Sequence, residues 1–270
     1  MTVRRGTATI LLLAALVWSA AAGAAEPEPA RALAPGLELL RFDVDTRSAW
    51  VDGDLHVLRV DPERWSLAVL ATSHHADGRK RTLAAWGRDF GLEAAINAGM
   101  YQGDGSTHVG FCQVDSTVLN RAANNYLSAF VCDPVDTVDA PFALIDLDET
   151  PLEVLRLRYR TVVQNLRLIK HPGRNRWSPG RERWREAALA EDGQGRALLI
   201  LCTRPLPMHD FNELLLALPL DVVAAQHLEG SAAAGLWVRA LEAGPERSAT
   251  GGSAVPNALV VRPRLPGGSP

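Results

Sequence analysis

Apolar residues recur along this chain in short runs, and each run ends at turn-forming residues. Runs at 37–44, 55–60 and 65–71 predict three strands, and the Asp-Gly pair within 51–54 predicts a hairpin turn between the first two. Further strands are predicted at 94–97, 109–114, 128–132, 161–165, 221–228 and 257–261. The pattern favours a fold built mostly from short strands joined by turns.

Two segments instead have the period of an amphipathic helix. The first has apolar positions at Leu83, Trp86 and Phe90. Thr82 precedes it, and a threonine side chain suits the N-cap of a helix. The second helix is expected to start at an Asp210 cap. Its apolar positions are Phe211, Leu214, Leu215 and Leu218.

A hairpin is predicted between the two apolar runs at 187–191 and 196–202. The turn 192–195 has the sequence Asp-Gly-Gln-Gly, which is typical of such a connection. No linker interrupts residues 37–263. Many strands with two helices over this range predict a single α+β domain, with a mixed β-sheet core and a few short helices.

The N-terminus has the pattern of a secretory signal peptide. Arg4 and Arg5 precede an apolar run at 10–22, and small residues up to Ala25 offer a cleavage site before Glu26. An uncleaved membrane anchor is the alternative, although the run is short and a breaker follows it. We therefore expect a periplasmic or secreted protein that has no membrane span after cleavage.

This interpretation divides the chain into four parts. Residues 1–25 are the predicted signal peptide, 26–36 a flexible lead-in, 37–263 the folded domain and 264–270 a tail. The 270 residues are 47% hydrophobic and 22% charged, which is ordinary for a globular protein. A net charge of −3 argues against nucleic acid as a partner.

The chain has three cysteines, and export makes a disulfide possible. Cys112 and Cys132 are close in sequence and both lie in predicted strands, so we predict that they pair. Cys202 ends an apolar run and is predicted to be a buried thiol. No cysteine spacing is typical of a metal site, and we expect no cofactor.

Three polar clusters allow more than one interpretation. His74 and His75 form either an exposed turn or part of a metal site. The segment 146–149 is either an acidic turn or a calcium loop. The segment 171–186 is a solvated loop, an anion-binding loop or, less favoured, a nucleic-acid contact. Its arginines are Arg174, Arg176, Arg181, Arg183 and Arg185.

Polar side chains stand at the ends of three predicted buried strands. One strand ends at Asn97, one at Gln164 and Asn165, and one at Leu228, which Glu229 follows. A rigid sheet that delivers amide and carboxyl groups at its strand ends is well suited to a binding site. We therefore expect these side chains to build one pocket.

Taken in order, segments between about residues 55 and 262 resemble the phosphodiester glycosidase family, which includes an enzyme that removes N-acetylglucosamine from a phosphodiester. The matching segments are His56–Pro62, Ala95–Tyr101, Val109–Phe111 with Asp115, Gln164, Arg185–Leu189, Leu228–Gly230 and Val255–Leu259. The resemblance implies an exported hydrolase that cleaves the glycosyl–phosphate bond of a sugar-1-phosphodiester.

Roles in that reaction follow from residue type. Glu229 is expected to act as a base or an electrostatic stabiliser, and Arg185 to hold the phosphate. Asn97 and Gln164 are expected to orient sugar or phosphate oxygens. Further substrate contacts are expected from Tyr101, His108, Asn165, His227 and Ser231.

The sequence also departs from the family pattern. Glu229 stands where the family has Asp, and Ser231 and Ala233 replace a later Gly and Ser. Displacing a catalytic group by ~1 Å can cost roughly a hundredfold in rate. The alternative function is therefore a non-catalytic protein that binds a glycan of the cell envelope on the same fold. We predict that Glu229 lies in a cleft within reach of Asn97 and Arg185, which would favour the enzyme.

Overall fold

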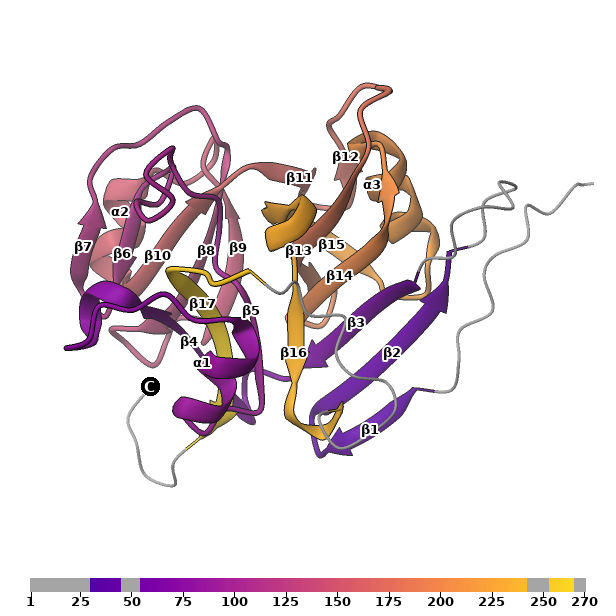
Figure 1. Ribbon diagram of the computed structural model, residues 1–270. Coiled ribbons are helices and arrows are strands. Elements are labelled where there is room, and N and C mark those ends of the chain that lie inside the picture. The colour runs from indigo at the N-terminus through magenta and orange to yellow at the C-terminus, as the bar shows by residue number, and fades with distance from the viewer. Residues whose placement is uncertain (1–29, 45–53, 242–252, 265–270) are drawn as a thin grey trace, which may run out of the picture.

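The computed structural model describes residues 30–44, 54–241 and 253–264, which form three β-sheets (Figure 1). The eight-stranded sheet has the order β1 (Arg31–Ala34), β2 (Leu37–Asp43), β3 (Asp54–Val60), β14 (Ala197–Leu206), β13 (Trp184–Asp192), β15 (Val222–Gly230), β11 (Arg167–Lys170) and β12 (Arg174–Asn175). The five-stranded sheet has the order β7 (Thr117–Asn120), β6 (Cys112–Val114), β10 (Tyr159–Asn165), β8 (Ser128–Pro134) and β9 (Phe142–Asp146). The four-stranded sheet has the order β16 (Leu236–Val238), β5 (Ala94–Asn97), β17 (Asn257–Pro263) and β4 (Trp65–Ala71).

The three sheets share one apolar core. One face of the eight-stranded sheet, with Leu199 and Leu228, packs against Ile96 of β5 and Phe130 of β8. The other face of the same sheet contributes Ile200 to a second core. Because residues Ala197–Cys202 of β14 are buried on both faces, they form a continuous apolar run without alternation.

Three short α-helices cover the outer faces of the sheets (Figure 1). Trp86 of α1 (Leu83–Asp89) packs on the four-stranded sheet, and Leu155 of α2 (Leu152–Arg158) packs on the five-stranded sheet. Phe211 and Leu215 of α3 (Met208–Ala217) cover the eight-stranded sheet. Three 3-10 turns complete the described elements, at η1 (Thr72–His74), η2 (Ser231–Ala233) and η3 (Arg239–Leu241).

The predicted sheet core with a few short helices is confirmed, and strands outweigh helices. Every strand pairing within the described residues is antiparallel. The Thr82 cap is confirmed, because its Oγ1 accepts from the Ala85 N–H at 3.2 Å. The β13–β14 hairpin is confirmed as well: Asp192 Oδ1 accepts from the N–H groups of Gln194 and Arg196, each at 3.0 Å.

Two local predictions are wrong. Helix α3 starts at Met208 with Pro207 as its N-cap, so Asp210 lies in the first turn and is not the cap. Proline suits this position because its φ is preset and its missing N–H would be unpaired in any helix. Arg31–Ala34, within the predicted flexible lead-in, forms β1 and pairs with β2.

The predicted Cys112–Cys132 disulfide is also wrong. All three cysteines are free and buried, and burial raises the pKa of each thiol to about 12. Cys112 pairs with Val163 and Cys132 with Thr161, on opposite edges of β10. Strands separated by a third lie about 9.5 Å apart, beyond the reach of a disulfide. Cys202 is a buried thiol as predicted.

Some predictions fall on residues outside the described ranges. These are the signal peptide 1–25, the turn at 51–53 and the tail from 265 onward. Among the described residues, no helix is long and apolar enough to span a membrane.

Candidate functional site

The ends of β5, β10 and β15 meet where the three sheets join. Asn97 at the end of β5 is fully buried, and its Nδ2 donates to Ala233 O at 2.9 Å while its Oδ1 accepts from Gly235 N at 3.0 Å. Both partners lie in the segment that follows β15. The Asn97 amide therefore fixes the chain just beyond Glu229 to the end of β5.

A second amide, Gln164 of β10, is used entirely by the backbone. Its Oε1 accepts from Phe111 N at 3.1 Å and Asn124 N at 3.2 Å. Its Nε2 donates to Asn124 O at 2.9 Å and Tyr126 O at 2.7 Å. All four hydrogen-bonding positions are filled, so Gln164 holds the segment before β8 in place.

Gly99, His108 and Asn165 form the tightest contact of this junction. Asn165 Nδ2 donates to Ala98 O at 3.1 Å, and His108 Nε2 lies 2.8 Å from Gln164 O. Gly99 has φ 153°, and a Cβ there would lie 2.2 Å from His108 Cε1 and 2.4 Å from Asn165 Oδ1. Only glycine fits. Burial lowers the pKa of His108, which leaves the ring neutral, and its Nδ1 has no hydrogen-bond partner among the residues that the structure describes.

Glu229 approaches this junction from β15. Burial raises the pKa of its carboxyl group, while the bond from Gly230 N (3.0 Å) and the nearby His227 lower it without cancelling the effect. Tyr101 is close to Asn97 and Glu229, although its buried hydroxyl makes no well-directed hydrogen bond within the described residues. Burial and the Glu229 charge raise the pKa of Tyr101. The structure thus brings Glu229, Tyr101 and Asn97 together.

Arg185 lies at the start of β13, beside the end of β15. Ala187 pairs with Glu229, and residues two apart on a strand share a face, so Arg185 points to the same side of the sheet as Glu229. The buried Nε of Arg185 has no hydrogen-bond partner in the described part of the chain. The expected exposure of Arg174, Arg176 and Arg181 is confirmed.

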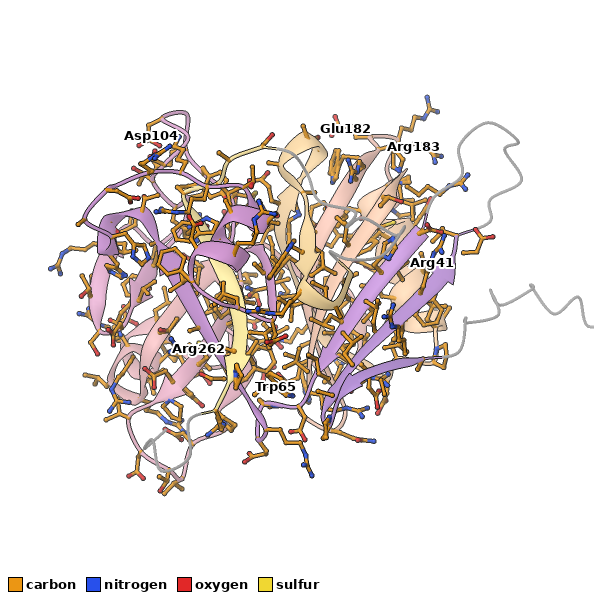
Figure 2. All side chains as sticks on the ribbon, turned by 60° about the horizontal axis from the view of Figure 1, so that its bottom comes forward. Arg41, Trp65, Asp104, Glu182, Arg183 and Arg262 are labelled. Atoms are coloured by element: carbon orange, nitrogen blue, oxygen red, sulfur yellow. The ribbon has the colours of Figure 1, made fainter. Side chains whose placement is uncertain are left out.

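Two exposed loops flank this end of the molecule. Figure 2 shows Asp104, in the loop after β5, and Glu182 and Arg183, in the loop before β13, on the same side of the molecule. Ser231, predicted to contact substrate, is exposed in η2 with a left-handed φ of 57°. The loop before β13 and η2 adjoin the Glu229 end of β15, because Glu186 pairs with Gly230 and η2 follows Gly230 directly.

His227 and Glu186 form a buried ion pair next to Glu229. The Nδ1 of His227 bonds to Glu186 Oε1, and the residues are 6% and 2% exposed. Sequence analysis missed Glu186. The signal that could have found it is a carboxylate at the start of the apolar run Ala187–Ala190, because a glutamate is almost never buried unless it is paired.

The other polar clusters are structural. The Nη1 of Arg167 lies 3.1 Å from Asp146 Oδ1 and 2.9 Å from Asp148 Oδ1. The segment 146–149 is therefore an acidic turn that forms ion pairs with Arg167. His75 packs against Phe90 in a tilted arrangement, with ring centroids 4.4 Å apart and an interplanar angle of 44°. No group of three potential metal ligands occurs among the described residues.

One large cleft, of about 860 Å³, lies elsewhere. It runs along β4, and Asp115, Asp133 and Arg262 contribute to its walls. None of the predicted site residues lines it. The junction around Glu229 is therefore the candidate site on grounds of polar convergence, and the cleft is a separate feature.

Comparisons with known proteins give the family and the fold of the chain. The sequence model described as phosphodiester glycosidase matches residues 90–262, well over half of the chain. The chain belongs to the phosphodiester glycosidase family. The match begins before β5 and ends in β17, so it includes the ends of β5, β10 and β15 that form the junction. No curated protein matches in sequence.

Solved structures show the same fold at low sequence identity. The catalytic domain of zebrafish N-acetylglucosamine-1-phosphodiester alpha-N-acetylglucosaminidase, auto-inhibited by its pro-peptide, aligns with a TM-score of 0.64 at 12% identity, over 90% of this chain and 89% of that one. A hypothetical protein from Synechocystis aligns with a TM-score of 0.61 at 13% identity, over 88% and 64% of the two chains. This phosphodiester glycosidase family member therefore has the fold of that catalytic domain.

Proposed function

We propose that this chain hydrolyses the glycosyl–phosphate bond of a sugar-1-phosphodiester. The observation that carries the proposal is Glu229, a largely buried carboxyl group at the acidic position of the family motif, beside Asn97 and Tyr101. Burial raises the pKa of this carboxyl group, and a partly buried carboxyl group with a raised pKa is a candidate for proton transfer.

The reaction proceeds by attack of water on the anomeric carbon. The new bond joins the water oxygen to that carbon, and the bond from the carbon to the phosphate oxygen breaks. Glu229 accepts the water proton, and the products are a free sugar and a phosphomonoester. Phosphate is already a good leaving group, so the site must chiefly stabilise charge as the bond breaks.

Arg185 supplies positive charge for the departing phosphate. Its position on the Glu229 side of the sheet points the guanidinium group toward the departing phosphate, while within the described residues its buried Nε has no hydrogen-bond partner. Asn97 and Gln164 act indirectly, because their amides hold in place the loops next to the site. Tyr101 and Ser231 are proposed to contact the sugar or its aglycone, whereas the buried His108 and Asn165 are proposed to hold the turn at Gly99.

Export to the periplasm or the medium is part of the proposal. The N-terminal pattern supports it, and a substrate of the cell envelope would be met there. Mass spectrometry of exported protein should show a chain that starts near Glu26; a full-length chain in the membrane would contradict export.

One observation favours the alternative, a glycan-binding protein without activity. The Gln164 amide is fully used by the backbone, and both the nitrogen and the oxygen of the Asn97 amide are bonded to the backbone, so fewer side chains than expected are free for catalysis. Binding of a sugar phosphodiester with no turnover would support this alternative.

The test is release of free reducing sugar from a panel of sugar-1-phosphodiesters. We expect turnover by the natural chain and a loss of about a hundredfold or more in Glu229→Gln. Glu182→Gln is the matched control, because Glu182 is exposed on the loop before β13. No sugar release from any substrate, or equal rates in Glu229→Gln, would refute the proposed function.

A further inference from the structure

Strand β4 forms a free edge of the four-stranded sheet, because β17 is its one partner strand in the described part of the chain. An edge strand presents unpaired backbone N–H and C=O groups along its outer side, and proteins often interrupt such an edge with a proline or a β-bulge. The seven residues of β4 include no proline, and their register with β17 is continuous. β4 therefore keeps a regular edge that can accept a further strand.

The register shows which backbone groups of β4 are unpaired. Thr72 N donates to Pro256 O at 2.9 Å, in register with the pairs of β4 and β17. Hydrogen-bonded and non-hydrogen-bonded pairs alternate along antiparallel strands, so Leu67 and Val69 turn their N–H and C=O groups away from β17. Pro263 falls at a non-bonded position, which suits a residue without an N–H. Among the described residues, no other element supplies partners for these groups of Leu67 and Val69.

The large cleft described above lies along this edge. Residues Ser66–Leu70 of β4 line it, and its opposite wall includes Val114 of β6, Thr117 of β7 and Pro134 of β8. An extended chain needs about 160 Å³ per residue, from a rise of about 3.3 Å, about 4.8 Å between strands and about 10 Å between sheets. The volume of about 860 Å³ therefore accommodates about five residues of extended chain, which matches the length of β4 that lines the cleft.

Two charged side chains in the cleft walls remain available to a ligand. Asp133 lies 3.3 Å from Arg160, and Arg264 donates to a backbone carbonyl at 2.6 Å. Arg262 and Asp115 are exposed, and the side chain of neither makes a hydrogen bond or ion pair with the described residues. The cleft thus combines unpaired backbone groups with one positive and one negative side chain.

We propose that this cleft binds an extended peptide of a partner protein, about five residues long, as an added strand along β4. This site is separate from the proposed function. The peptide backbone pairs with Leu67 and Val69, an acidic side chain of the peptide meets Arg262, and a basic one meets Asp115. Arg262 pairs with Ser66 near the start of β4, and Figure 2 shows it at the same end of the molecule as Trp65. A second copy of this chain does not fit, because one strand of this length fills the volume and leaves no room for the strands beside it.

Binding of synthetic peptides to the full chain tests the proposal by fluorescence anisotropy. One labelled probe has the sequence Glu-Val-Thr-Val-Thr-Val-Lys, and a second has its two charged ends exchanged, because an added strand can run in either direction. The control forms are N-methylated at the valines or at the threonines. Alternate amides point to opposite edges of a strand, so one N-methylated form should bind about tenfold more weakly than its parent and the other should change less. Full affinity in both forms would overturn backbone pairing.

Variants of the chain locate the bound peptide. Thr117→Trp fills the cleft from an exposed position and should weaken binding about tenfold, whereas Thr137→Trp, which is exposed outside the cleft, should bind like the natural chain. Arg262→Glu should weaken binding of the preferred peptide about fivefold, and Arg181→Glu, on the loop before β13, should not. Equal affinity in Thr117→Trp and Thr137→Trp would place the peptide outside the cleft and overturn the proposal.

Amide hydrogen exchange shows directly whether a strand is added. With peptide bound, the Leu67 and Val69 amides should exchange about tenfold more slowly, whereas the Ala68 amide, which faces β17, should change less. Unchanged exchange at Leu67 and Val69, or no binding of either peptide, would overturn the proposal. Self-association of the chain that Thr117→Trp abolishes, without peptide binding, would assign the edge to a second copy and would overturn it as well.

Discussion

Gly99→Ala is the substitution that tests the geometry of the junction most severely. A Cβ at Gly99 would lie 2.2 Å from His108 Cε1 and 2.4 Å from Asn165 Oδ1, far inside normal contact distance. Neither neighbour is free to move, because His108 is bonded to Gln164 O and Asn165 to Ala98 O. The φ of 153° is also unfavourable for alanine.

Two costs add at this position. Overpacking of a filled interior costs typically about 1–3 kcal/mol, and a backbone held in a sparsely populated region costs about 1–3 kcal/mol more. We therefore expect Gly99→Ala to lower the free energy of unfolding by about 3 kcal/mol, which corresponds to a fall in Tm of roughly 6–12 °C for a domain of this size.

Two control variants separate the costs. Gly91 has φ 63° with nothing within 4 Å of its Cβ position, so Gly91→Ala measures backbone strain alone, about 1 kcal/mol. Gly103 has neither a positive φ nor a neighbour within 4 Å, so Gly103→Ala should be neutral. Urea unfolding of the three variants gives the free energies. If Gly99→Ala is as stable as Gly103→Ala, the packing of His108 and Asn165 described above is wrong.

Three further predictions concern other parts of the site and core. Arg185→Lys keeps the charge but loses the planar fork, so affinity for phosphate should fall about tenfold by calorimetry; unchanged affinity would remove Arg185 from the site. Gln164→Ala leaves four backbone groups unpaired, a buried one at Phe111 and three part-buried ones at Asn124 and Tyr126, and should lower the free energy of unfolding by about 3 kcal/mol, whereas Gln194→Ala, at an exposed position, should not. Alkylation of the unfolded, unreduced protein should modify three thiols. Modification of only one thiol would instead support the disulfide between Cys112 and Cys132.

Much of the fold follows from local sequence signals. Thr82 caps α1 because its side chain and the Ala85 N–H are only three residues apart. The turn at 192–195 forms because Asp192 bonds to neighbouring backbone groups. Such interactions join residues that are close in the sequence, so the sequence predicts them well.

Strand order is not local, and there the sequence was insufficient. The disulfide prediction failed because β10, which follows Cys132 by many residues, inserts between β6 and β8. The start of α3 was misplaced because Asp210 offers a stronger capping signal than Pro207, yet proline fixes the turn geometrically.

The candidate site also has features that the sequence predicts and features that it does not. The polar strand ends Asn97, Gln164 and Glu229 were readable, because each interrupts or follows an apolar run. The hydrogen-bond partners of the Asn97 and Gln164 amides could not be predicted, because they are backbone atoms from loops distant in the sequence. The pair of Glu186 and His227 spans 41 residues and forms only after β13 and β15 align. Physical pairing across strands, and not residue type, decides which polar groups are free.

The fate of isotope from ¹⁸O-labelled water tests the proposed chemistry most directly. The natural chain is incubated with a sugar-1-phosphodiester, and the masses of both products are measured by mass spectrometry. Cleavage at the anomeric carbon places the label in the free sugar and leaves the phosphomonoester unlabelled, and the reaction should fall with Glu229→Gln. Label in the phosphomonoester would mean that water attacks phosphorus, and would contradict a phosphodiester glycosidase activity for this chain.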